Sequence, residues 1–165
     1  MKKIITLGLV CSLAACATSI QELSVSETRT VATKLPPMSY GQGQLCISRV
    51  GDAYTCDKGL KFDFIDNYER IIGDIRTGNE YFCVNLTPGN HNISGNAKSS
   101  VYYAGAALPT ESRVGEDINI IAGRRTFMEL QCTNWGGGVQ LVPVSQVRGL
   151  TGIYNTNKYQ QKYGK

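Results

Sequence analysis

Apolar and polar residues alternate in steps of two along much of the chain from Gln44 onward. Leu45 and Ile47 alternate with polar neighbours, and the pattern recurs around 61–64, 81–86, 118–120, 127–132 and 139–144. Clusters of Gly, Asn, Asp and Pro separate these stretches at intervals of roughly 8–15 residues, as turns do between short strands. The pattern predicts an all-β fold, a small antiparallel β-sandwich of about seven strands over residues 44–153.

Two segments interrupt the alternation. The segment from Gly95 to Gly115 lacks the alternation and is predicted to be a long connection, whose middle is either an extra short strand or a mobile loop. Ser145 to Ile153 has the composition of one or two helical turns. Residues 154–165 are polar and rich in Tyr and Lys, and we expect this tail to fray.

The first residues have the plan of a secretory signal peptide. Met1-Lys2-Lys3 is positively charged, the ten residues from Ile4 to Leu13 carry no charge, and the stretch ends in Leu13-Ala14-Ala15-Cys16. No apolar run reaches the ~18 residues of a membrane-spanning helix. We therefore expect residues 1–15 to be a cleaved leader.

The Leu-Ala-Ala-Cys ending resembles the lipobox of bacterial lipoproteins. The resemblance implies cleavage between Ala15 and Cys16 and attachment of diacylglycerol, with palmitate-type acyl chains, to Cys16. Several acyl chains anchor a protein stably, whereas one chain binds only marginally. Ala17 stands where an inner-membrane lipoprotein carries Asp, which implies the outer membrane and a domain that faces the periplasm. Residues 16–43 are rich in Ser, Thr, Ala and Gln and are expected to be a flexible tether.

The middle of the chain resembles a known lipoprotein domain. Arg70-Ile71-Ile72-Gly73-Asp74-Ile75, Tyr81 to Leu86 and the turn Pro88-Gly89-Asn90-His91 follow one another in order, and Ala122-Gly123 leads into another alternating stretch. This order is similar to that of the DUF2846 group of small bacterial lipoproteins and their PEGA-like relatives. Asn67 stands where that group usually has Gly. The resemblance implies a β-sandwich and an envelope location, and it implies no catalytic residue.

Four cysteines remain beside Cys16 in the processed chain, and their even number in an exported domain predicts two disulfides. Cys46 and Cys56 flank Gly51 symmetrically, so a hairpin would pair them and leave Cys83 with Cys132. Alternation puts Cys132 in phase with Met128 and Cys83 out of phase with Phe82, so that second bond would need a β-bulge. The alternative pairing joins Cys46 to Cys83 and Cys56 to Cys132.

Few residues offer catalytic or metal chemistry. His91 is the only histidine, and its turn-to-strand context favours a half-buried structural residue that packs beside a tyrosine. The cysteine spacing contains no Cys-x₂₋₄-Cys pair, so we expect no zinc site. Because His91 is alone, no paired nucleophile motif is present and the resembled family has no established catalytic residues, we also expect no cofactor and no enzyme.

The net charge and the last residues of the sequence limit the classes of partner that we expect. The net charge is +4, and removal of Lys2 and Lys3 with the leader leaves +2, which argues against a nucleic-acid partner. We therefore expect a lipid-anchored binding or scaffolding protein of the cell envelope. Alternatives are a structural lipoprotein joined to peptidoglycan through Lys165, whose Lys-Tyr-x-Lys context resembles the end of murein lipoproteins, and an inhibitor or accessory subunit of an envelope enzyme or secretion system.

Overall fold

The computed structural model describes residues 22–49, 61–75, 80–103, 106–132, 139–156 and 158–159. Within them, side chains of 97–103, 106–112, 132 and 158–159 are not described. The elements in chain order are α1 (Val25–Lys34), β1 (Gly43–Arg49), β2 (Phe62–Asp66), β3 (Arg70–Ile75), β4 (Glu80–Leu86), β5 (Gly89–Tyr103), β6 (Ala106–Ile120), β7 (Arg125–Cys132), β8 (Val139–Val144), α2 (Gln146–Tyr154) and β9 (Lys158–Tyr159).

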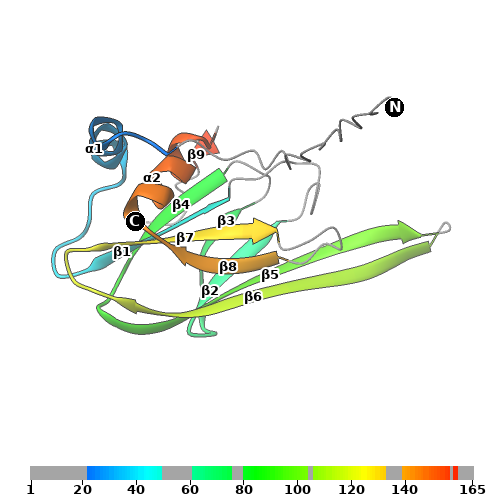
Figure 1. Cartoon of the computed structure of the whole chain (residues 1–165). Coiled ribbons are helices and arrows are strands. Elements are labelled where there is room, and N and C mark those ends of the chain that lie inside the picture. Colours follow the sequence, from blue (N-terminus) through cyan, green and yellow to red (C-terminus); the bar gives the residue numbers. More distant parts are fainter. Residues whose placement is uncertain are drawn as a thin grey trace, which may run out of the picture.

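The strands form two sheets that pack face to face, which confirms the all-β sandwich (Figure 1). Sheet A has the order β8-β7-β1-β4-β9 and sheet B the order β3-β2-β5-β6. The described strands thus exceed the expected seven. Sheet A is also mixed, because β1 runs antiparallel to β4 but parallel to β7.

The space between the sheets is filled by the apolar residues that the alternation marked. Phe64 of β2 meets Phe82 of β4 with ring centroids 5.5 Å apart, which ties sheet B to sheet A. Burial of each such side chain stabilises the fold by roughly 1.5–3 kcal/mol. Fully buried members of this core include Leu45, Ile47, Phe62, Phe64, Ile75, Leu86, Ile93 and Met128.

A third layer of two helices covers the outer face of sheet A (Figure 1). The flexible tether expected over 16–43 is therefore wrong for the part that α1 occupies. Ser24 and Glu27 form a capping box at the start of α1, and Val31 and Leu35, four positions apart, share one buried face. A backbone hydrogen bond from Leu23 to Thr151 Oγ1, 3.1 Å long, joins this segment to α2.

A disulfide joins Cys46 of β1 to Cys83 of β4. The two residues lie directly opposite each other in the antiparallel register, with Cα atoms 4.1 Å apart, and face the helices. The pairing favoured from the sequence, Cys46 with Cys56 and Cys83 with Cys132, is wrong because the antiparallel neighbour of β1 is β4 rather than a strand that follows Gly51. Cys56 lies outside the described residues, and Cys132 ends β7 opposite Val139.

The long connection expected at 95–115 is instead the greater part of one long hairpin. β5 and β6 stay paired from Gly89↔Ile120 to Tyr103↔Ala106 without a break in register. The far end of this hairpin extends beyond the rest of the sandwich (Figure 1). Ile93 and Val114, on its near half, are buried in the core, so this half cannot be a dispensable loop.

The chain end is partly ordered against sheet A. The helical turns expected over 145–153 are confirmed by α2, which begins at an N-cap serine, Ser145. Beyond α2, β9 pairs in parallel with Glu80 and Tyr81 of β4, so the start of the tail forms a short strand where fraying was expected.

Candidate functional site

The turn between β2 and β3 has an unusual backbone. The amide of Glu69 donates to the carbonyl of Asp66, 3.0 Å away, and both central residues have positive φ, 49° at Asn67 and 61° at Tyr68. Primed hairpin turns have this pattern and usually place Gly in the second central position. A left-handed tyrosine is strained. The Tyr68 residue is nevertheless 77% exposed.

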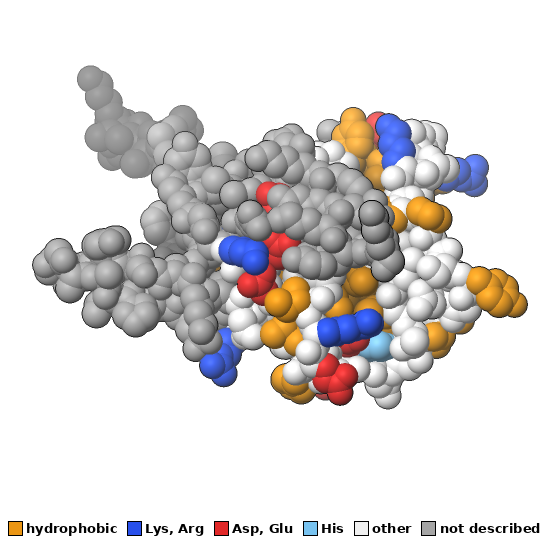
Figure 2. Space-filling model, turned by 180° about the vertical axis from the view of Figure 1, so that it is seen from behind, with side chains coloured by type: hydrophobic (Ala, Val, Ile, Leu, Met, Phe, Trp, Pro, Cys, Tyr) orange, Lys and Arg blue, Asp and Glu red, His pale blue; other side chains and the backbone are white. Residues whose placement is uncertain are grey.

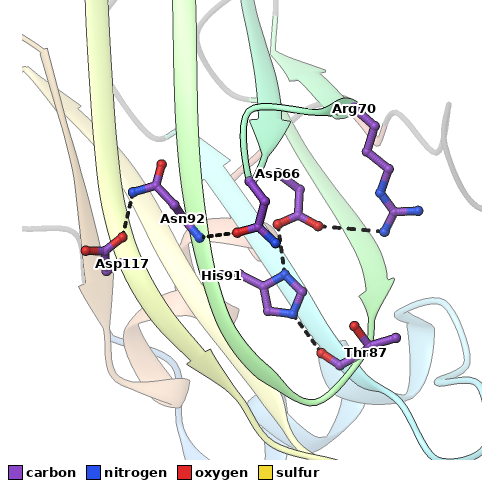
Figure 3. Close-up of polar contacts among 7 residues, drawn as sticks. Asp66, Arg70, Thr87, His91, Asn92 and Asp117 are labelled. Atoms are coloured by element: carbon purple, nitrogen blue, oxygen red, sulfur yellow. Dashed lines mark hydrogen bonds and ion pairs between the residues drawn. The ribbon is translucent and has the colours of Figure 1, made fainter.

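His91 of β5 lies buried beside this turn (Figure 3). Its Nδ1 is 2.8 Å from Oδ1 of Asp66, and its Nε2 is 2.8 Å from the carbonyl oxygen of Thr87. A carboxylate and a carbonyl oxygen both accept hydrogen bonds, so the geometry is satisfied when both ring nitrogens donate. Arg70 approaches the other Asp66 oxygen at 3.7 Å.

This arrangement fits a structural histidine rather than a catalytic base. Both ring nitrogens of His91 are already engaged with protein oxygens, so neither is directed at a substrate. His91 was expected to be half-buried beside a tyrosine. It is instead 6% exposed and bonded to Asp66 and Thr87, so it fastens β5 to the end of β2.

An open hollow of about 560 Å³ lies next to this pair. Cross-strand register sets Asn90 opposite Asn119 and Asn92 opposite Asp117. Asn92 is held on both sides: its backbone amide donates to Asn67 Oδ1 over 2.9 Å, and its Nδ2 donates to Asp117 Oδ1 (Figure 3). The lining residues are Asn67, Asn90, His91, Asn92, Asp117, Ile118 and Asn119.

The polar groups of this hollow are not fully used within the described protein. Asn92 Oδ1 is buried and has no hydrogen-bond partner there. None of the described lining residues is Lys or Arg. In Figure 2, in which His91 is the only pale-blue side chain, basic and acidic side chains lie beside it. The hollow is thus lined mainly by polar side chains and is open to solvent.

A second cleft, of about 600 Å³, lies where α1 meets α2 and β4. Its lining mixes apolar and charged side chains, among them Val31, Lys34, Tyr81 and Tyr154. Tyr154 is exposed and Tyr81 is buried. Because its walls are helices, the shape of this cleft depends on how firmly they are held to sheet A.

A partly buried ion pair holds α2 on the sheet. Arg148 of α2 donates two hydrogen bonds to Glu129 of β7, from Nε at 2.8 Å and from a terminal nitrogen at 2.9 Å. These hydrogen bonds raise the pKa of Arg148. Glu129 is 2% exposed, so loss of Arg148 would leave a buried carboxyl group without these two hydrogen bonds.

Several predicted site residues cannot be placed. Ala15, Cys16, Cys56 and Lys165 lie outside the described residues. In the described part of the chain, no three His, Cys, Asp or Glu residues gather as metal ligands would, and no helix has the length and apolarity to cross a membrane.

Sequence reasoning missed the partners of His91. The turn at Asp66-Asn67 and the turn before His91 were both visible, but 25 residues separate Asp66 from His91. Only the pairing of β2 with β5, in which Asp66 lies opposite Ile93, brings the two turns together. In the sequence, the one signal of this site was the single histidine directly after a polar turn.

Comparison with protein-family models, with curated proteins and with solved structures gives no match.

Proposed function

We propose that this chain is a lipid-anchored lipoprotein of the bacterial outer membrane, facing the periplasm and acting there as a binding or scaffolding module. The observation that carries the proposal is the Leu13-Ala14-Ala15-Cys16 sequence behind a positive, then apolar, leader. The similarity to the DUF2846 and PEGA-like group supports the same location.

The fold sets how closely an anchor on Cys16 would hold the domain. The described domain begins at Glu22, six residues after Cys16. Six residues span at most ~20 Å when fully extended. An anchored sandwich would thus sit near the membrane surface, rather than at the end of the long tether that the sequence suggested.

Binding suits the described site better than catalysis. Both ring nitrogens of His91 are held by Asp66 and Thr87, and four of the seven described lining residues of the hollow are asparagines. Side chains of this kind orient and recognise a ligand, and they need no cofactor. Among the alternatives, an accessory subunit is favoured by the β5–β6 hairpin, which extends from a rigid sandwich as partner-binding elements do.

One experiment on whole cells tests both parts of the proposal. Envelopes of cells that make the wild-type chain or the Cys16→Ser variant are separated by density and extracted with detergent. We expect wild-type protein in the outer-membrane fraction and the variant outside it. Chemical crosslinking before extraction then identifies what is captured: muropeptides would favour the Lys165 link, and a protein partner would favour the accessory subunit. Equal fractionation of both forms would refute the anchor.

A further inference from the structure

We propose that the hollow at the β2–β3 turn binds a neutral saccharide, with Tyr68 as a stacking residue. The hollow is lined by paired amide and carboxylate side chains, and the strained, exposed Tyr68 directly follows Asn67 of that lining. The inference deepens the binding role proposed above and rests on it.

The lining matches a ligand made of hydroxyl groups. Each sugar hydroxyl both donates and accepts, and an Asn side chain offers a donor and an acceptor in one plane. Four asparagines and one aspartate line the hollow, and the register holds them as two cross-strand pairs: Asn90 with Asn119, and Asn92 with Asp117. Side chains fixed on neighbouring strands need little ordering when a ligand binds.

Charge excludes other classes of small ligand. Asp66 contacts His91 and Arg70, whereas Asp117 contacts the neutral amide of Asn92. None of the described lining residues is Lys or Arg, and the ring of His91 is already paired with Asp66 and Thr87, so the lining offers no free cation to a phosphate or carboxylate ligand. Ile118 is the one aliphatic residue in the lining, too little for a lipid or another apolar ligand. A neutral, hydroxyl-rich molecule needs neither a cation nor a large apolar surface in its binding site.

Tyr68 supplies the second observation. It follows Asn67, whose side chain lines the hollow, and it holds a bulky ring in solvent at φ 61°. Glycine would fit this backbone without strain. A strained residue that packs against no core is explained when its side chain contacts a ligand. The flat ring of a tyrosine offers an apolar face to the C–H face of a sugar and a hydroxyl at its edge.

The test uses the full-length processed protein in a detergent without a sugar headgroup. Isothermal titration calorimetry is run with N,N′,N″-triacetylchitotriose, cellotriose and maltotriose. Each sugar is added up to about 10 mM, because a dissociation constant near 1 mM is then measurable. We expect saturable binding of at least one trisaccharide. Asp117→Ala and Asn119→Ala should each weaken it about fivefold to tenfold, the loss expected for one hydrogen bond.

Two glycine variants separate function from folding. Tyr68→Gly should weaken binding about tenfold and yet raise the melting temperature by about 2–4 °C, because the strain is released. Tyr40→Gly is the matched control: Tyr40 is an exposed tyrosine in a turn, but its backbone φ is not positive and neither of its chain neighbours lines the hollow. It should leave binding unchanged and add no stability.

Absence of saturable binding by all three sugars would overturn the saccharide site, and so would binding that Tyr68→Gly and Asp117→Ala leave unchanged. Membrane fractionation decides the anchor separately. If the sugars do not bind but the protein fractionates with the outer membrane, only the saccharide site is refuted. If the sugars bind but the protein does not fractionate with the outer membrane, only the proposed location is refuted.

Discussion

His91 and Asp66 fasten β5 to the end of β2 through a buried contact of 2.8 Å between Nδ1 and Oδ1. The second ring nitrogen of His91 is held by the carbonyl of Thr87 at the same distance. The pair thus fixes the start of the long β5–β6 hairpin against the β2–β3 turn. A site built on that turn inherits its rigidity from this contact.

Removal of either partner should cost more than an ordinary polar substitution. His91→Asn would leave the Asp66 carboxylate buried with only the more distant Arg70, and we expect a loss of about 2–4 kcal/mol of unfolding free energy. Asp66→Asn should cost a similar amount. Urea unfolding of both variants and of the double variant measures their coupling, which should exceed about 1 kcal/mol. Glu69→Gln, an exposed acid in the same turn, is the control. Additive effects within about 0.5 kcal/mol would show that the contact carries no energy.

Two glycines of sheet B, Gly73 and Gly115, differ in how much space surrounds them, so one serves as the control for the other. A Cβ on Gly73 would lie 2.4 Å from the ring of Phe82, whereas a Cβ on Gly115 would have its nearest atom, the carbonyl oxygen of Ile93, at 3.8 Å. Gly73→Ala should therefore destabilise the fold by about 1–3 kcal/mol or more, through overpacking between the sheets. Gly115→Ala should be neutral or slightly stabilising. Thermal unfolding of the two variants compares them directly, and equal melting temperatures would contradict the packing described here.

The ion pair between Arg148 and Glu129 should be essential for the helical layer. Arg148→Met would leave the carboxylate of Glu129, which is 2% exposed, without its partner. We expect the free energy of unfolding to fall by about 3–5 kcal/mol. Arg29→Met removes an exposed arginine from α1 and should change stability by less than about 0.5 kcal/mol. Chemical denaturation gives both values. A similar small effect of the two substitutions would mean that Glu129 finds another partner.

The cysteine pairing has a direct chemical test. Digestion without reductant should release a peptide pair that links Cys46 to Cys83. If Cys56 and Cys132 form the second disulfide expected from the even count, the intact mass lies four hydrogens, rather than two, below that of the reduced chain. The double variant Cys46→Ala/Cys83→Ala should lose about 2–4 kcal/mol of stability. A Cys46–Cys56 peptide would contradict the register of β1 with β4.

The period-two pattern was enough to predict the sandwich, because Leu45, Phe62 and Phe82 each alternate with residues that face away from the core. It could not predict α1, since Val31 and Leu35 are only two apolar positions in a polar segment and are buried by contact with a distant helix. The Cys46–Cys83 bond likewise needed the strand order. Periodicity tells which face a residue occupies, whereas pairing between strands far apart in sequence tells which residue lies opposite.

The hollow was invisible in the sequence for the same reason. Asn67, Asn92 and Asp117 come from three segments that look like ordinary turn or strand-surface residues. The departure from glycine at the β2–β3 turn was noted at Asn67, but the residue under strain with an exposed ring is the next one, Tyr68. Only backbone dihedral angles separate the two.

The lipid anchor can be tested most directly on the protein isolated from the membranes of a bacterium that makes it. Trypsin should release the peptide from Cys16 to Arg29, because no Lys or Arg lies between them. Mass spectrometry should find this peptide with a diacylglyceryl group on the Cys16 sulfur and an acyl chain on its new amino terminus. A peptide that begins at another residue, or one whose Cys16 thiol is free, would contradict the proposal that this chain is a lipoprotein.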